Sequence, residues 1–204
     1  LAEEVATITA AIDALAAALV RLARRSDGPR RGQQVRATVV DDPRGIIAAR
    51  TSELPIVLRG ALDPTAIAAA AGPERRAVGA VVRGPVTPAL AAAAVAAGLT
   101  AASVDGTDDD VRALAAAGVA AVELRVAPTD GATAVTRARA LPITQLRVEV
   151  DLHRLGLGHA ATATADLAAL VAAATAAGVA VEVSPLDTGT TLAAWMPVVP
   201  SRTR

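Results

Sequence analysis

Seven short apolar segments, most of them separated by alanine-rich stretches, constrain the fold of this chain more than any other feature. The segments are nearly continuous runs of small and branched apolar residues, and the stretches between them have the composition of helices. Continuous apolar strands that alternate with helices are typical of a parallel sheet covered by helices. The predicted strands comprise residues 35–40, 56–58, 77–82, 100–104, 119–126, 146–152 and 179–183.

Turn and capping residues mark the ends of the predicted helices. Asp63 and Thr87 each precede a proline, which is the pattern of an N-cap followed by proline at the first helical position. Gly98 and Gly118 end two of the helices. The aspartates at 108–110 begin another helix, where capping and compensation of the helix dipole account for them without a metal ion.

Alternation of this kind over 204 residues predicts an α/β fold of the (β/α)8-barrel type, small or incomplete, as a single domain spanning residues 1–204. An open doubly wound parallel sheet is the alternative architecture. The tail after Ser184 is too short to supply a full additional strand–helix unit.

The composition excludes several kinds of chemistry. The chain contains no Lys, Cys, Phe, Tyr or Asn and a single Trp, a bias that indicates a GC-rich bacterial genome. A Schiff-base lysine, a disulfide and a thiolate metal site are therefore impossible. A formal net charge of zero and the near absence of aromatic residues argue against a nucleic-acid partner.

The first 25 residues predict an amphipathic helix, because apolar residues recur in steps of three and four. This helix either packs on the sheet or forms a seam for a protein partner or a dimer. The basic run at 21–31 is interpreted as a solvated helix end. The apolar stretch at 88–97 is too short to cross a bilayer and no signal sequence is recognised, so we expect a cytoplasmic protein without a membrane partner.

Polar residues lie at or just beyond nearly every predicted strand end. In parallel α/β folds ligands bind at the carboxyl ends of the strands, where the loops converge. A site is therefore expected among these residues. They are Asp41, Arg59, Arg83, Asp105, Arg125, Asp151 with His153, and Ser184.

The strand at 146–152 carries an unusual concentration of charge. Arg147, Glu149, Asp151 and His153 alternate with apolar residues and therefore share one face. Buried charges need partners, and the neighbouring strands offer Glu123, Arg125 and Glu182. This face predicts either a polar interior that holds a charged ligand or divalent ion, or an Arg–Glu network that fills the barrel.

Residues 153–159 form a glycine-containing loop flanked by two histidines, which has the composition of a phosphate cradle. As metal ligands, His153 and His159 would need carboxylates such as Asp151 and Asp187. We predict no metal site there. No dinucleotide fingerprint, lysine-containing phosphate loop or serine elbow is present.

The segment 141–149, Leu-Pro-Ile-Thr-Gln-Leu-Arg-Val-Glu, resembles the Leu-Pro-Val-x-x-Leu-Lys-Ile-Asp strand of the EAL-type cyclic-di-GMP phosphodiesterase domain. The resemblance implies that Arg147 and Glu149 stand where that family has an active-site Lys and Asp. Residues 39–44 are similar to the family's Val-Asn-Leu-Ser-Pro-Arg motif, and 184–188 fall where it has Glu-Gly-Val-Glu-Thr. About half of the chain is covered.

The same resemblance implies a degenerate member. The strand with the family's metal-binding Glu would precede Leu1, its metal-binding Asn corresponds to Val40, and its paired aspartates fall near Leu124 and Arg125. Two-metal hydrolysis needs several converging carboxylates. We therefore expect a non-hydrolytic domain without a cofactor, in which Mg²⁺ would be needed only if phosphodiesterase activity is retained.

Three hypotheses follow from the sequence. The first is a degenerate EAL-like barrel that acts as a regulatory or interaction module in signal transduction and binds a cyclic dinucleotide or another small anion. The second is an unrelated barrel enzyme acting on a small anionic or phosphorylated substrate, and the third is a scaffold without a ligand. The candidate ligand-binding residues are Arg125, Arg147, Asp41 and Ser184, and the candidate catalytic residues are Glu149, Asp151 and His153.

Overall fold

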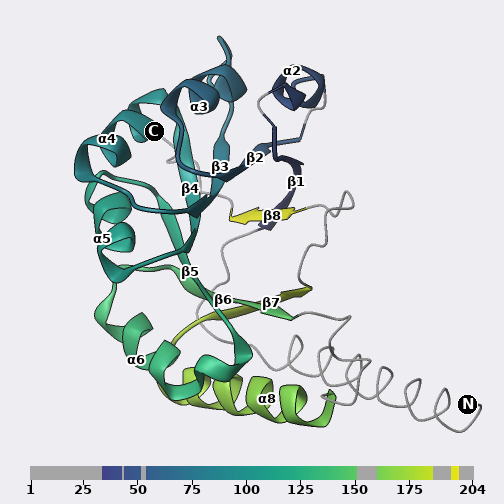
Figure 1. Ribbon diagram of the computed structural model, residues 1–204, viewed down its shortest axis with the longest axis vertical. Helices are drawn as coiled ribbons and strands as arrows, with labels where there is room; N and C mark the ends of the chain where they lie inside the picture. The colour runs from purple at the N-terminus through teal and green to yellow at the C-terminus, as the bar shows by residue number, and fades with distance from the viewer. Residues whose placement is uncertain (1–33, 43, 52–53, 151–159, 186–193, 198–204) are drawn as a thin grey trace, which may run out of the picture.

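The computed structural model describes residues 34–42, 44–51, 54–150, 160–185 and 194–197, which form one curled eight-stranded sheet (Figure 1). The strand order is β7-β6-β5-β4-β3-β2-β1-β8, so that seven parallel strands follow one another in chain order and β8 runs antiparallel to β1. The strands are β1 (Gln34–Val40), β2 (Ile56–Gly60), β3 (Val78–Arg83), β4 (Leu99–Asp105), β5 (Ala121–Val126), β6 (Gln145–Val150), β7 (Val181–Pro185) and β8 (Ala194–Pro197).

Helices cover the convex side of this sheet, and the described strands enclose a concave side opposite them (Figure 1). The short helix α2 contacts β1 and α3, whereas α3 to α6 follow the curve of the sheet and α8 packs against α6 and β7. The helices are α2 (Gly45–Ala49), α3 (Pro64–Ala71), α4 (Pro88–Ala97), α5 (Asp108–Ala116), α6 (Gly131–Ala140) and α8 (Ala160–Ala176), with a 3₁₀ turn at Pro128–Asp130.

The core divides between the two faces of the sheet. Larger apolar residues such as Ile56, Leu124 and Leu146 face the helices in one continuous cluster with Ile67 and Leu114. The concave face carries a separate cluster of mostly small residues, Ala37, Val57, Ala101 and Ala121. Small side chains on the inner surface take little room, so they allow the sheet to curl.

The predicted helix caps are present. The Asp63 carboxylate accepts from Thr65 N at the start of α3, and Thr87 Oγ1 accepts from Leu90 N at the start of α4. Thr107 and Asp110 form a capping box at the start of α5. The aspartate run at 108–110 therefore belongs to a helix start, as the sequence indicated.

The predicted fold class is confirmed: the described residues form a curled half-barrel of seven parallel strands that alternate with helices, consistent with a small or incomplete (β/α) barrel. The doubly wound alternative is wrong, because a doubly wound sheet reverses its strand order and these seven strands follow the chain without reversal. Several strand bounds differ from expectation: β3 and β4 extend to Arg83 and Asp105, β5 begins at Ala121, and β7 begins at Val181 and includes Ser184. Strand β2 extends to Gly60 and so includes Arg59, and the tail contributes β8 through pairing with β1. The predicted helix at 1–25 and the basic run at 21–31 lie outside the described residues.

Candidate functional site

The concave face is polar from the middle of the sheet to the carboxyl ends of the strands. Because side chains alternate along a strand, the residues between those that face the helices must point to the inside of the curve. Five neighbouring strands contribute polar residues to this inner face. They are Arg59 from β2, Arg83 from β3, Ser103 and Asp105 from β4, Glu123 and Arg125 from β5, and Gln145 and Arg147 from β6.

Glu123 and Arg147 form the most deeply buried ion pair that the described residues show. Arg147 Nε donates to Glu123 Oε2 at 2.6 Å and Nη2 donates to Oε1 at 2.9 Å, with side-chain exposures of only 7% and 3%. Gln145 Nε2 also donates to Oε1. Two parallel hydrogen bonds in a buried setting fix the guanidinium plane of Arg147.

Arg125 is a half-buried cation beside this pair. Its Nη1 donates to Ser103 Oγ at 3.2 Å across β4 and β5, and in the β5–β6 register it lies opposite Arg147. Burial, together with the positive charges of Arg147 and Arg83, lowers the pKa of Arg125 to about 10, against the opposing effect of Asp105 and Glu123. The guanidinium is therefore charged at neutral pH in a region where further positive charge is unfavourable.

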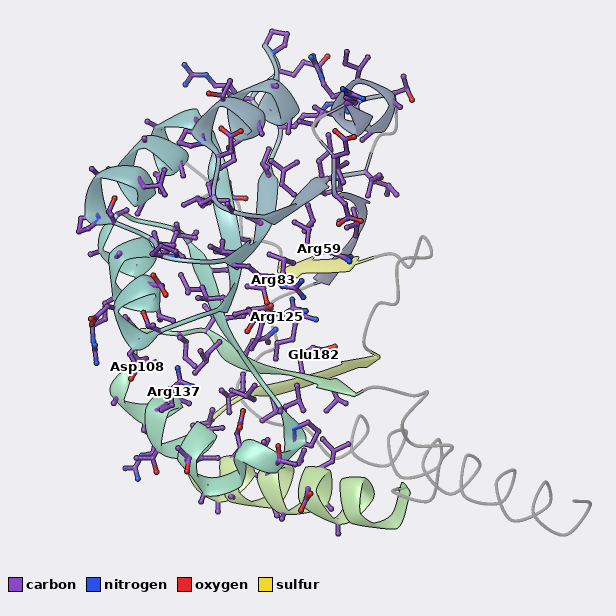
Figure 2. All side chains as sticks on the ribbon, in the orientation of Figure 1. Arg59, Arg83, Asp108, Arg125, Arg137 and Glu182 are labelled. Carbon is purple, nitrogen blue, oxygen red and sulfur yellow. The ribbon has the colours of Figure 1, made fainter. Side chains whose placement is uncertain are left out.

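Two more arginines carry looser ion pairs. Arg83 Nε lies 3.4 Å from Asp105 Oδ2, and Arg59 Nε lies 3.2 Å from Asp41 Oδ1. In Figure 2 the side chains of Arg83 and Arg125 lie between β8 and β7, where Glu182 also lies, and Arg59 is drawn beside β8. Three strands thus bring guanidinium groups to the carboxyl end of the sheet, which is where parallel α/β folds bind ligands.

The structure brings some of the sequence-predicted site residues together. Arg125 and Arg147 are register partners on β5 and β6, and Asp41 reaches Arg59 from the end of β1. Glu149 and Ser184 are register partners on β6 and β7. The sequence left open whether Arg147 binds a ligand or belongs to an Arg–Glu network. In the structure Arg147 forms a buried ion pair with Glu123. Asp151, His153, His159 and Asp187 lie outside the described residues.

The candidate list from sequence lacked Arg59, Arg83, Ser103 and Asp105. Three of these were recognised as polar strand ends, but nothing in the sequence distinguished them as binding residues. The signal that could have found them is alternation: Ser103 and Asp105 are two positions apart on β4, and Arg83 ends the strand beside it. Ser103 itself lies within an apolar run and shows its role only through the contact with Arg125.

Asp110 is a buried carboxylate with a structural role. Its Oδ1 accepts from Val86 N at 2.6 Å, and its Oδ2 accepts from both the backbone and the hydroxyl of Thr107. Burial raises the pKa of Asp110, but these hydrogen bonds outweigh that effect and the pKa lies below its usual value. The carboxylate thus joins the start of α5 to the loop after β3. Within the described part of the chain, no three His, Asp or Glu side chains are placed to hold a metal ion.

A pocket of about 260 Å³ opens elsewhere in the molecule, between the ends of α6 and α8 and the starts of β6 and β7. It is lined by small and apolar residues together with Arg139, Thr144 and Gln145. The arginines of the concave face do not line it. We place the candidate site at the carboxyl ends of the strands, because charged groups from several strands converge there.

No protein-family model matches the sequence, and a comparison with curated proteins likewise finds no match. None of the helices within the described residues combines the length and hydropathy needed to cross a bilayer.

Proposed function

We propose that this protein is a non-hydrolytic binding module in signal transduction whose concave face takes a phosphate-bearing anion, with a cyclic dinucleotide as the candidate ligand. The observation that carries the proposal is the convergence of Arg59, Arg83 and Arg125 on the carboxyl end of the sheet (Figure 2). Guanidinium groups present planar arrays of donors that match phosphate oxygens, so arginines that β2, β3 and β5 bring to one edge of the sheet can bind the phosphates of one ligand together.

The electrostatics of Arg125 support an anionic ligand. The positive charges of Arg147 and Arg83 repel the positive charge of Arg125, and an anion bound among the three would reduce this repulsion. A chain without Phe or Tyr has few aromatic surfaces for stacking bases. Arginine planes can stack on bases, so the same residues could hold the base and the phosphate of a nucleotide.

The choice of a cyclic dinucleotide rests on the resemblance of residues 141–149 to the EAL-type strand. The proposal that the domain is non-hydrolytic rests on the positions that would carry that family's metal ligands. Val40 and Leu124 are buried apolar residues in the cluster that faces the helices, and Arg125 is a cation. None of these three side chains can coordinate a divalent cation.

The test is isothermal titration of the protein with cyclic di-GMP, with and without Mg²⁺, beside a sugar phosphate and inorganic phosphate. We expect saturable binding of the dinucleotide that does not require Mg²⁺ and no hydrolysis product by chromatography. Arg83→Gln and Arg125→Gln should each weaken binding by about tenfold, the scale of a lost charge-assisted hydrogen bond. Arg112→Gln is the matched control, because Arg112 lies on α5 and pairs with Asp109.

The other outcomes are equally informative. Release of a linear dinucleotide would contradict the non-hydrolytic assignment. Binding of the sugar phosphate alone would favour the barrel-enzyme hypothesis. An absence of binding to all three compounds would overturn the proposal and favour a scaffold.

A further inference from the structure

Asp105 lies among the arginines that the proposed ligand would contact. It is the register partner of Arg83 on β3, and its Oδ2 is 3.4 Å from Arg83 Nε. Its negative charge also acts on Arg125, which neighbours it on β5. The carboxylate of Asp105 therefore interacts electrostatically with two guanidinium groups, those of Arg83 on β3 and Arg125 on β5.

This ion pair differs in kind from the pair formed by Glu123 and Arg147. The buried pair has two hydrogen bonds at 2.6 and 2.9 Å, whereas the Arg83–Asp105 contact is 3.4 Å long. The side chains of Arg83 and Asp105 are 56% and 57% exposed, so water can replace either partner. A half-exposed contact of this length contributes little free energy, and a better anion can displace it.

We infer that Asp105 is an internal competitor for the ligand, and that a phosphate group binds by taking the place of its carboxylate at Arg83, where the phosphate also meets the positive charge of Arg125. This inference rests on the proposed function and names a residue that sets the affinity of the protein for its ligand. A phosphate offers more acceptor oxygens than a carboxylate and can contact both guanidinium groups at once. The carboxylate then weakens binding at all ligand concentrations, because the ion pair must be broken first.

The experiment compares Asp105→Asn with the wild-type protein by titration with cyclic di-GMP and with inorganic phosphate. Asn keeps the shape of the side chain and removes the charge. We expect binding to strengthen by about two- to fivefold, the scale of a half-exposed ion pair. Added NaCl should narrow the difference, because salt screens exposed charges.

Asp109→Asn is the matched control. It makes the same change in net charge, and Asp109 is 92% exposed on α5, where it pairs with Arg112. A general effect of net charge would strengthen binding equally in both variants, and that result would overturn the inference. Melting temperatures of both variants report whether the fold is retained.

The two proposals fail in different ways. If the wild-type protein binds the ligand and Asp105→Asn binds it equally or more weakly, only the competitor role is contradicted. Equal binding would mean that Asp105 does not affect the affinity, and weaker binding would mean that Asp105 positions Arg83 for the ligand. Binding by Asp105→Asn in the absence of wild-type binding would show that Asp105 blocks the site, and it would overturn the proposed function of the wild-type protein. If neither protein binds either compound, both the inference and the proposed function are wrong.

Discussion

Arg147 and Glu123 are joined by two hydrogen bonds across β5 and β6, and both side chains are almost completely buried. Since Glu123 lies opposite Gln145 and Arg125 lies opposite Arg147, the pair runs diagonally over the sheet. This ion pair on the concave face therefore favours the observed register of β5 and β6. Arg147 therefore differs from Arg83 and Arg59. The carboxylate partner of Arg147 is buried, whereas the carboxylate partners of Arg83 and Arg59 are exposed.

Replacing Glu123 by Ala should lower the free energy of unfolding by about 3–5 kcal/mol, because it leaves the buried Arg147 without its carboxylate. Denaturation in urea measures the change. The double variant Glu123→Leu with Arg147→Met should recover most of the loss, since apolar residues of similar size can replace a buried pair. Glu74→Ala, which breaks the exposed pair with Arg76, should cost only about 0–1 kcal/mol. Equal losses for Glu123→Ala and Glu74→Ala would contradict this account.

The affinity for cyclic di-GMP should be constant between about pH 6 and 8 and should fall as the pH rises through about 10. Arg125 is positive below its lowered pKa of about 10 and loses its charge above it, so the form that attracts an anion is the low-pH form. The phosphodiesters of cyclic di-GMP do not titrate in this range but its guanine N1–H groups do, so inorganic phosphate, which stays dianionic from about pH 9 to 11, is titrated in parallel; the chain itself has no Lys, Cys or Tyr. Titration calorimetry across the range provides the profile. A midpoint between about pH 5 and 8 would contradict the assignment to Arg125 and is the range in which histidine titrates.

Asp110→Asn should destabilise the protein by about 1–3 kcal/mol at neutral pH, because an amide cannot accept both hydrogen bonds from Thr107 while accepting from Val86 N. The pKa of Asp110 is lowered in the folded protein, so its contribution is complete above the usual value of 3.8. It is lost as the pH falls through the lower, folded-state pKa. Chemical denaturation at neutral and acidic pH should show the gap between wild type and variant closing in acid. Asp109→Asn, one position earlier and exposed, should cost about 0.5 kcal/mol.

Gly98→Ala should be more destabilising than Gly118→Ala, although both glycines have positive φ angles, +116° and +94°. A Cβ at Gly98 would lie 3.0 Å from Ala71 Cβ, whereas a Cβ at Gly118 would meet nothing within 4 Å. Backbone strain should cost about 1 kcal/mol at either position, and displacement of α3 should add about 1 kcal/mol at Gly98. Thermal unfolding of the two variants measures the difference. Equal effects would mean that α3 moves without cost.

The elements of the fold could be predicted from local patterns. Continuous apolar runs indicated all seven parallel strands, and the pairs Asp63-Pro64 and Thr87-Pro88 indicated where helices begin. Strand β8 could not be predicted, because four residues carry little signal of their own and pair only once β1 is in place. The alternation of strands and helices predicted a parallel sheet but left two strand orders open, that of a barrel and that of a doubly wound sheet, and the structure shows the unreversed order.

The candidate site depended much more on tertiary structure. Sequence alone grouped Arg125 and Arg147 as ligand-binding residues, Arg125 because it lies near a strand end and Arg147 because of the charged face at 146–152 and the resemblance of 141–149 to the EAL-type strand. The structure distinguishes them, since the partner of Arg147 is Glu123, which lies 24 residues away in the chain. Sequence by itself indicated the seven parallel strands and the capped starts of α3, α4 and α5, because these follow from neighbouring residues. Only the tertiary structure decided that Arg147 pairs with the buried Glu123 and that Arg59, Arg83 and Arg125 lie at the carboxyl end of the sheet. Those positions depend on the curl and register of strands that are far apart in the sequence.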